Sequence, residues 1–398
     1  MLDRIERTFG EDIFAKAALV SGIVFAVIYA AYLFTLHFPY DFANYLIGWD
    51  YVNVWMGARA ALAGHVHALF DVVSYLKQQH SLFPAMQPHN WSYPPDVLLF
   101  IWPLGLLPYL PSYVLWTIAG VGGFMATALR DGATPRKAAF LLLAPAVIIN
   151  IFAGQNGLFT SALLIGGLLN LDRRPWLAGL CLGLLTLKPQ LGLLIPVALI
   201  LSWRWRPIVA AAVTTAVLFA LSSAIFGISA WSDYVHLALP IQTKVMNYGG
   251  PMMLAMAPTP FMNARLLGLS HEAALWVQIP FTFMALAAVI WTFSAKRDPE
   301  LSRAVLITAC FIATPYMFDY DMPIFGWLMW RLRDRFSNRN DIGLALAVWA
   351  MPAITIFMGL CGVPGSGLVL PALLLRLVWM LRAENVAVFE PVAKPLAL

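Results

Sequence analysis

The chain has 398 residues, of which 61% are hydrophobic and 11% are charged. An ordinary soluble domain carries about 25% charged residues, so we expect an all-α polytopic membrane protein instead. The net charge of +5 does not indicate nucleic acid as a partner, because cytoplasmic loops of membrane proteins are enriched in Lys and Arg. Three cysteines lie in apolar runs and are expected to be buried thiols rather than disulfides: Cys181, Cys310 and Cys361.

The apolar runs predict about twelve membrane spans, since a spanning helix needs about 20 mostly apolar residues. No small-residue cleavage site follows Lys16–Phe38, so this run is expected to be a retained span rather than a signal peptide. Some runs are short, which is typical of helices that stop at a water-filled cavity. The predicted spans are 16–37, 113–129, 138–153, 157–171, 175–187, 190–203, 207–226, 273–295, 301–315, 321–333, 341–359 and 366–381.

The distribution of cations predicts the orientation of these spans. Most Lys and Arg residues fall on alternate connections, which the positive-inside rule places in the cytoplasm together with both termini. The membrane is then a bacterial-type inner membrane, and residues 1–398 form a single integral-membrane domain. The extracytoplasmic loops are 38–93 and 227–258. Five cations remain on the outer side: Arg59, Lys77, Lys188, Lys244 and Arg265.

The outer loops are expected to contain helices of their own. The patterns at 51–64 and 69–80 are amphipathic enough to lie in the membrane interface and form a roof over a site. The loop 227–258 has a similar character. The proline-rich segment Pro94–Pro111 is interpreted as a re-entrant or bent half-helix, because prolines interrupt helices.

Ionisable residues on the outer side are the candidate functional groups, since charges in or near the membrane are costly. Asp50 precedes the helix predicted at 51–64, where it is either a general base or an ordinary N-cap. Lys188 lies between two apolar helices beside Pro189. Its ammonium either binds an anion such as a phosphate or extends to the membrane interface.

Three further motifs have both a functional and a structural interpretation. Gln155 and Asn156 either contact a sugar or diphosphate or form a tight turn. Asp319 and Asp321 bind a divalent cation, contact substrate or cap the next helix. Tyr93 precedes two prolines, which favour an extended backbone. His65, His67, His80 and His89 lack the ligand set of a zinc site. The predicted substrate-binding residues are Lys188, Arg59, Gln155, Asn156, Tyr93, Gln190, Tyr316, Asp319 and Asp321.

Two classes of protein remain compatible with these observations. A transporter or flippase is expected to show repeats and polar groups at the bilayer midplane. Here the two halves of the chain do not resemble each other, and the polar residues gather at one face. A membrane enzyme that acts on lipid substrates at the outer interface fits this distribution better.

The order of the motifs resembles glycosyltransferase family 87. The blocks that carry the resemblance cover nearly the whole chain, and they are fairly specific only in combination. They are Gly48-Trp49-Asp50-Tyr51, Tyr93-Pro94-Pro95, Gly154-Gln155-Asn156-Gly157, Leu187-Lys188-Pro189-Gln190 and Phe318-Asp319-Tyr320-Asp321. In the last block, Tyr320 and Asp321 stand where better-studied members have histidines, which leaves the sugar undefined.

The resemblance implies a GT-C type membrane fold and an inverting transfer of a mannose-like hexose from a polyprenyl-phosphate donor to a lipid or glycan. The family's catalytic aspartate corresponds to Asp50. Lys188 and Arg59 are then the expected charge partners of the leaving phosphate. No metal or other cofactor is required by this reaction. No nucleotide is expected, because the sequence contains no Gly-rich phosphate loop.

Overall fold

The computed structural model describes residues 2–37, 39–41, 44–248, 251–336 and 338–389. Within these ranges all regular secondary structure is helical, apart from the isolated bridges His37–Tyr40 and Tyr40–Leu46. The predicted all-α polytopic fold is therefore confirmed. The described cysteines are free, as expected, but Cys361 is exposed rather than buried.

Six helices in the described ranges are long and apolar enough to cross a membrane. A seventh candidate is the pair α7 (Pro135–Leu142) and α8 (Pro145–Ala153), which is bent by 53°. The bend lies at Pro145, because proline cannot donate a hydrogen bond within a helix. The six long helices are α1 (Leu2–Thr35), α6 (Tyr109–Ala128), α12 (Trp205–Phe226), α17 (His271–Phe293), α20 (Arg339–Leu360) and α21 (Val369–Phe389).

The predicted number of twelve spans is not confirmed, because the other predicted spans are shorter helices. Helices α18 and α19 are buried along most of their length, so they form the core of the bundle. The shorter elements are α9 (Gly157–Asn170), α10 (Pro175–Gly183) with η3 (Leu184–Leu187), η4 (Pro189–Gly192) with α11 (Ile195–Leu201), α18 (Pro299–Ala313) and α19 (Pro323–Leu332).

The segment 38–93, which is the predicted first outer loop, contains the expected helices, but one of them lies in a different environment. Nine of the thirteen residues of α2 (Tyr51–Ala63) are buried, so α2 is not the amphipathic interfacial helix that its pattern indicated. It packs against η2 (Trp102–Leu106), α5 (Leu98–Ile101) and α6. The segment 69–80 falls in α3 (His67–Phe70) and α4 (Val72–Leu82).

The proline-rich segment and the second outer segment are also helical in short pieces. The elements η1 (Pro95–Val97), α5 and η2 follow one another without a gap and form a short helical run that ends at Leu106, before α6. This length agrees with the predicted half-helix, and its re-entrant course stays a prediction. The second outer segment contains the following elements: α13 (Ile228–Asp233), η5 (Tyr234–Ala238), α14 (Leu239–Tyr248) and α15 (Pro251–Ala255). The remaining elements are α16 (Pro260–Leu266), η6 (Asp319–Asp321), η7 (Arg333–Arg335) and η8 (Ser366–Leu368).

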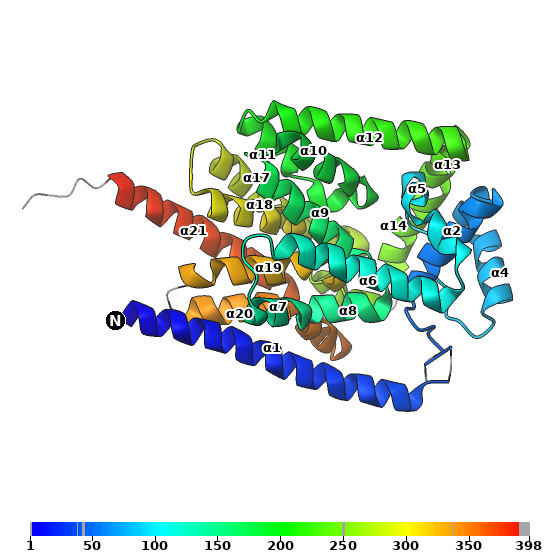
Figure 1. The fold of residues 1–398 in the computed structure, drawn as a ribbon, viewed down its shortest axis with the longest axis horizontal. Coiled ribbons are helices and arrows are strands. Elements are labelled where there is room, and N and C mark those ends of the chain that lie inside the picture. The colour runs from blue at the N-terminus through cyan, green and yellow to red at the C-terminus, as the bar shows by residue number, and fades with distance from the viewer. Residues whose placement is uncertain (1, 38, 42–43, 249–250, 337, 390–398) are drawn as a thin grey trace, which may run out of the picture.

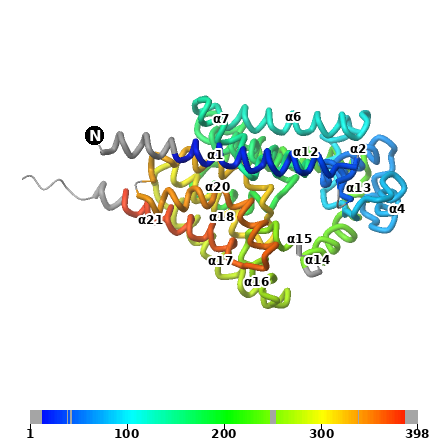
Figure 2. The backbone as a smooth tube through the Cα atoms, turned by 90° about the horizontal axis from the view of Figure 1, so that it is seen from below, coloured from blue at the N-terminus to red at the C-terminus, as the bar shows by residue number. Residues whose placement is uncertain are grey.

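The long helices run along the longest axis of the molecule (Figure 1). Helix α1 begins at the end where α21 finishes, while α2, α4 and α13 lie at the opposite end (Figure 1). Figure 2 shows α1 and α6 along one side and α14 and α16 along the other. The outer surface of α1 is apolar, with Val27 and Phe34 exposed by 65% and 91%. Such a surface is expected where a helix faces lipid.

Candidate active site

A cavity of about 670 Å³ is lined in part by residues of the segment 38–93, which is the predicted first outer loop. Five parts of the chain form it. They are the start of α2, the chain before η1, helix α14, the break between η3 and η4, and the segment before η6. These elements are far apart in the sequence, so the cavity exists only in the assembled fold. The residues that line it include Asp50, Asn53, His89, Tyr93, Gln155, Lys188, Gln190, Gln242, Tyr316, Tyr320 and Asp321.

Asp50 faces this cavity and does not act as a conventional helix cap. It directly precedes α2, but among the described groups its carboxylate accepts no capping hydrogen bond. Its backbone N–H donates to the carbonyl of Ala153 at 2.9 Å, which fixes the start of α2 to the end of α8. The N-cap interpretation is therefore wrong, and the carboxylate is free to contact other groups.

His89 is the residue that contacts the Asp50 side chain. Its Nε2 lies 3.5 Å from Oδ1 of Asp50, and its Nδ1 lies 2.9 Å from the carbonyl oxygen of Gln87. Burial lowers the pKa of His89, but the hydrogen bond and negative charge of Asp50 outweigh burial and raise the pKa above its ordinary value. The imidazole is therefore biased toward its charged form beside the carboxylate.

The backbone of His89 is held in turn by Gln79 of α4. The Gln79 amide donates to the His89 carbonyl at 2.8 Å, and its oxygen accepts from the His89 N–H at 3.1 Å. Gln79 is only 3% exposed. Because a buried amide is costly unless it is hydrogen-bonded, this pair of bonds fixes the loop that carries His89.

Lys188 lies at the break between η3 and η4, as its proximity to Pro189 suggested. Its Nζ donates to Oδ1 of Asp321 at 2.6 Å, and both side chains are largely buried. The ammonium also lies 4.7 Å from the centre of the Tyr320 ring. Lys188 therefore does not extend to the membrane interface, and its positive charge faces a carboxylate at the cavity wall.

The segment 316–321 is held in place from several sides. The Tyr316 hydroxyl donates to Oε1 of Gln242 at 2.9 Å, and the Asp319 N–H donates to the Met256 carbonyl at 2.8 Å. Gly157 is required at this contact, because a Cβ there would lie 1.8 Å from the Tyr320 carbonyl oxygen. The two carboxylates of η6 accept backbone N–H groups from Tyr320 and Phe318. They do not cap the next helix, as one interpretation of the sequence expected, because the N-cap residue of α19 is Met322 and it makes no side-chain capping bond.

The structure brings together most of the predicted substrate-binding residues. Tyr93, Gln155, Gln190, Tyr316, Lys188 and Asp321 line the cavity with Asp50. Burial raises the pKa of Tyr93 and the Asp50 carboxylate raises it further, so its phenol remains a hydrogen-bond donor.

Three predicted residues do not line this cavity. Arg59 stacks over Trp55 at 4.9 Å and lines a separate cavity. Asn156 and Asp319 are buried behind the wall, each with one side-chain oxygen that has no partner among the described atoms. The expected turn at residues 154–157 is formed by Gly154, which has a φ of +69° and ends α8.

Several residues of the site were not identified from the sequence. His89 was considered only with the other histidines as a zinc ligand, and Gln79 and Gln242 lie in segments without a recognisable motif. In the described ranges, no group of three or more His, Cys, Asp or Glu side chains is arranged to hold a metal ion. The one feature of the sequence that pointed to His89 as a site residue is its position just before Trp91-Ser92-Tyr93.

Comparisons with known proteins identify the family. The model of glycosyltransferase family 87 matches residues 91–315, which is more than half of the chain. An alpha-(1->3)-arabinofuranosyltransferase from Mycobacterium tuberculosis, in strains CDC 1551 / Oshkosh and ATCC 25618 / H37Rv, is 27% identical over 271 residues. The match covers 62% of this chain and 60% of the relative's length. No solved structure matches. On the extent of the family match, this chain belongs to glycosyltransferase family 87.

Proposed function

We propose that this protein transfers a sugar from a polyprenyl-phosphate donor to a hydroxyl group of a lipid or glycan. The reaction takes place in the cavity that contains Asp50, at the extracytoplasmic face of a bacterial-type inner membrane. The proposal rests on one observation. The Asp50 carboxylate, which makes no capping bond to α2, and Lys188 lie in the same cavity. A carboxylate serves as a base, and an ammonium stabilises a leaving phosphate.

Asp50 is the proposed general base. Its carboxylate accepts the proton of the acceptor hydroxyl while the hydroxyl oxygen forms a bond to the anomeric carbon. The bond from that carbon to the phosphate oxygen breaks, and its electron pair leaves with the polyprenyl phosphate. Attack from the face opposite the phosphate inverts the configuration. A positioned base contributes a factor of about 10²–10⁴ to the rate.

His89 is proposed to position this base. The Tyr51 and Asn53 N–H groups already donate to the carbonyls of Gly48 and Asp50. Asp50 nevertheless stands at the N-cap position of α2, from which an aspartate side chain commonly turns toward the helix. The contact of 3.5 Å with His89 opposes that rotation. Gln79 fixes His89 through its backbone, so α4 sets the direction of the Asp50 carboxylate without touching substrate.

Lys188 is the proposed partner of the donor phosphate. Charge-assisted hydrogen bonds to phosphate are stronger than neutral ones, and the low-polarity cavity wall strengthens them further. In the structure, Asp321 partly neutralises Lys188, so an incoming phosphate must compete with that carboxylate. The Gln155 side-chain oxygen has no partner among the described atoms and is available to a sugar hydroxyl. Arg59 remains a candidate only for a group that reaches the neighbouring cavity.

The sugar has two candidates. The motif order favours a mannose-like hexose, and the name of the mycobacterial relative favours an arabinofuranose. Both donors present an anomeric carbon joined to a polyprenyl phosphate, so the roles of Asp50 and Lys188 are the same for either. The ring size decides how Gln155, Tyr93 and Tyr316 contact the sugar.

The test is a transfer assay with purified protein in proteoliposomes. Polyprenyl-phosphate mannose and polyprenyl-phosphate arabinofuranose are supplied separately, and label is followed into extracted lipids and glycans. Asp50→Asn should reduce transfer by about 10²–10⁴. Asp71→Asn is the matched control, because Asp71 caps α4 through the Val73 N–H and asparagine also caps well.

A different outcome would favour the alternative function. If the parent protein moves the lipid-linked sugar across the bilayer without forming a new glycosidic bond, the protein is a flippase or transporter. Equal transfer by Asp50→Asn and Asp71→Asn would remove Asp50 from the reaction.

A further inference from the structure

A second cavity of about 650 Å³ lies at the opposite end of the molecule from the proposed active site. Three connections enclose it: the α9–α10 connection, the α11–α12 connection and the α17–α18 connection. The last two are visible in Figure 1 at the end where α1 begins and α21 finishes. This cavity shares no lining residue with the Asp50 cavity.

The second cavity carries an excess of positive charge. Its lining contains four cations, Arg204, Lys296, Arg297 and Arg303, and a single carboxylate, Asp172. Asp172 is shared, since its oxygens lie 2.7 Å from Arg204 and 3.5 Å from Arg303. Within the described ranges, Lys296 and Arg297 have no carboxylate at ion-pair distance. The Arg297 guanidinium stacks on the Trp291 ring at 3.8 Å, and its buried Nε has no hydrogen-bond partner.

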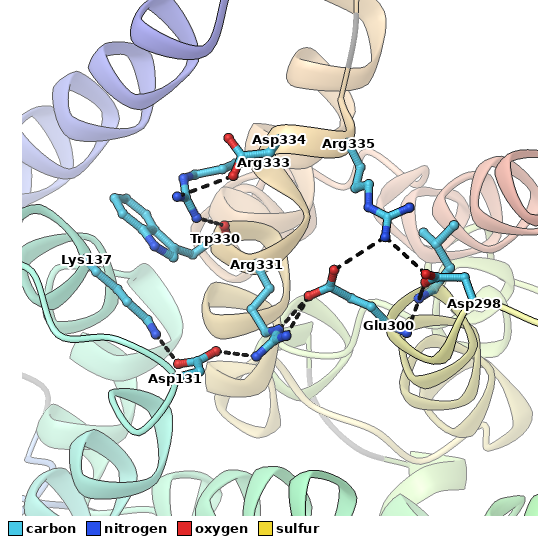
Figure 3. Close-up of polar contacts among 10 residues, drawn as sticks. Asp131, Lys137, Asp298, Glu300, Trp330, Arg331, Arg333, Asp334 and Arg335 are labelled. Atoms are coloured by element: carbon cyan, nitrogen blue, oxygen red, sulfur yellow. Dashed lines mark hydrogen bonds and ion pairs between the residues drawn. The ribbon is translucent and has the colours of Figure 1, made fainter. Parts of the chain in front are cut away.

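Neighbouring cations at the same end of the molecule are arranged differently. Figure 3 shows a network in which Lys137, Arg331, Arg333 and Arg335 contact Asp131, Asp298, Glu300 and Asp334. That network therefore contains as many carboxylates as cations. The enrichment of cytoplasmic loops in Lys and Arg accounts for cations at this end, but it does not account for their uncompensated convergence on one cavity.

The edge of the second cavity also has the features of a membrane interface. Trp203 and Trp205 are 78% and 49% exposed, and tryptophans are enriched at the level of lipid headgroups. Trp203 has a φ of +54°, in the left-handed region where a helix usually ends on glycine. A bulky residue held in that conformation is a strained position, and strained positions are retained where they serve a function.

We propose that this second cavity binds the phosphate headgroup of an anionic phospholipid. Arg297 and Lys296 supply charges that no carboxylate neutralises, Arg204 and Arg303 extend the positive surface, and the tryptophans lie against the acyl chains. Basic pockets between helices are a known way to recognise acidic headgroups. This inference does not depend on the sugar-transfer reaction.

The experiment measures lipid binding to the full-length protein in nanodiscs of phosphatidylcholine with added phosphatidylglycerol. After extraction into mild detergent, mass spectrometry counts the phosphatidylglycerol that each protein retains. Lys296→Gln/Arg297→Gln should weaken this retention about fivefold for each cation removed. The matched control is Arg173→Gln/Arg206→Gln, because both of these arginines are exposed and neither lines the cavity.

A second variant keeps every cation and should change the retention of phosphatidylglycerol in the opposite direction. Asp172→Asn releases Arg204 and Arg303, so it should increase the retention of phosphatidylglycerol. Equal losses in the two double variants, or no gain with Asp172→Asn, would overturn the proposal. Displacement of the bound lipid by millimolar inorganic phosphate would assign the site to free phosphate and also overturn it as a lipid site.

Discussion

Replacement of Lys188 by methionine tests whether the Lys188–Asp321 pair serves the substrate or only the fold. Methionine retains most of the apolar stem of lysine and removes the charge. The Asp321 carboxylate, whose side chain is 1% exposed, is then left buried without its partner. Asp321→Asn removes the opposite charge and retains an oxygen that can accept the Phe318 N–H.

The magnitude follows from the geometry. Unit charges 2.6 Å apart attract by about 6 kcal/mol at an effective dielectric constant of about 20. Because burial of the charges offsets part of this attraction, loss of one partner costs about 3–5 kcal/mol. With an unfolding entropy of about 2.1 cal/mol/K per residue, the unfolding temperature should fall by about 4–6 °C. The double variant Lys188→Met/Asp321→Asn should recover most of this loss.

Two measurements separate stability from binding. Thermal unfolding of the parent, the two single variants and the double variant in detergent measures what the pair contributes to stability. Binding of polyprenyl phosphate to the same proteins measures what the pair contributes to substrate binding. Lys188→Met should weaken binding about 10–100-fold, because a hydrogen bond to a charged group contributes about 1.5–3 kcal/mol. Asp321→Asn should strengthen binding, because it removes the competing carboxylate.

The matched control is Arg376→Met, which breaks the pair of 2.6 Å with Asp341 outside the site. It should lower the unfolding temperature without changing the binding of polyprenyl phosphate. If Lys188→Met is destabilised in the same way and still binds polyprenyl phosphate as tightly as the parent, the pair is structural and Lys188 has no role at the phosphate.

Three further predictions concern the rest of the molecule. His89 is charged below its pKa, which Asp50 raises above its ordinary value. Its contact with Asp50 should therefore weaken as the pH rises through that pKa. His89→Gln should lower kcat and abolish the alkaline limb of the pH profile, and an unchanged profile would contradict the positioning role. The second prediction uses a Cys361→Ala background, which removes the exposed thiol. Cysteines introduced at Ser74 and Ser294 should then react with impermeant reagents from opposite sides of the membrane. Labelling of both from one side would contradict the predicted orientation. Gly157→Ala should reduce transfer and stability together, because its Cβ would lie 1.8 Å from the Tyr320 carbonyl oxygen. Gly343→Ala is the control and should leave both unchanged, because a Cβ there meets nothing within 4 Å.

The sequence predicted the class of fold well. Low charge and long apolar runs are sufficient to identify helices such as α12 and α17, since they span about the thickness of a bilayer. They do not identify the environment of a short apolar helix. Helix α2 was placed at the interface because its pattern is amphipathic, but its polar residue Asn53 accepts a buried hydrogen bond from Tyr75 at 2.6 Å.

The candidate site was predicted in part for a similar reason. Asp50 and Lys188 were conspicuous, because charges are rare in this chain. Their partners could not be predicted, because the pairings of Asp50 with His89 and of Lys188 with Asp321 join segments that are distant in sequence. The Asp50 carboxylate could equally have capped α2, and only the assembled loop shows that it contacts His89 instead.

The burial of α2 has a consequence for how the protein is made. The helix packs against α5, η2 and α6, and Asp50 is anchored to Ala153, so the outer segment must wait for these later residues to be synthesised and inserted. Asp321 joins Lys188 only after α18 has been added. A chain interrupted after α17 would therefore contain Asp50, His89 and Lys188 with one wall of the cavity missing. In such a chain Lys188 would lack the carboxylate that neutralises it in the complete protein.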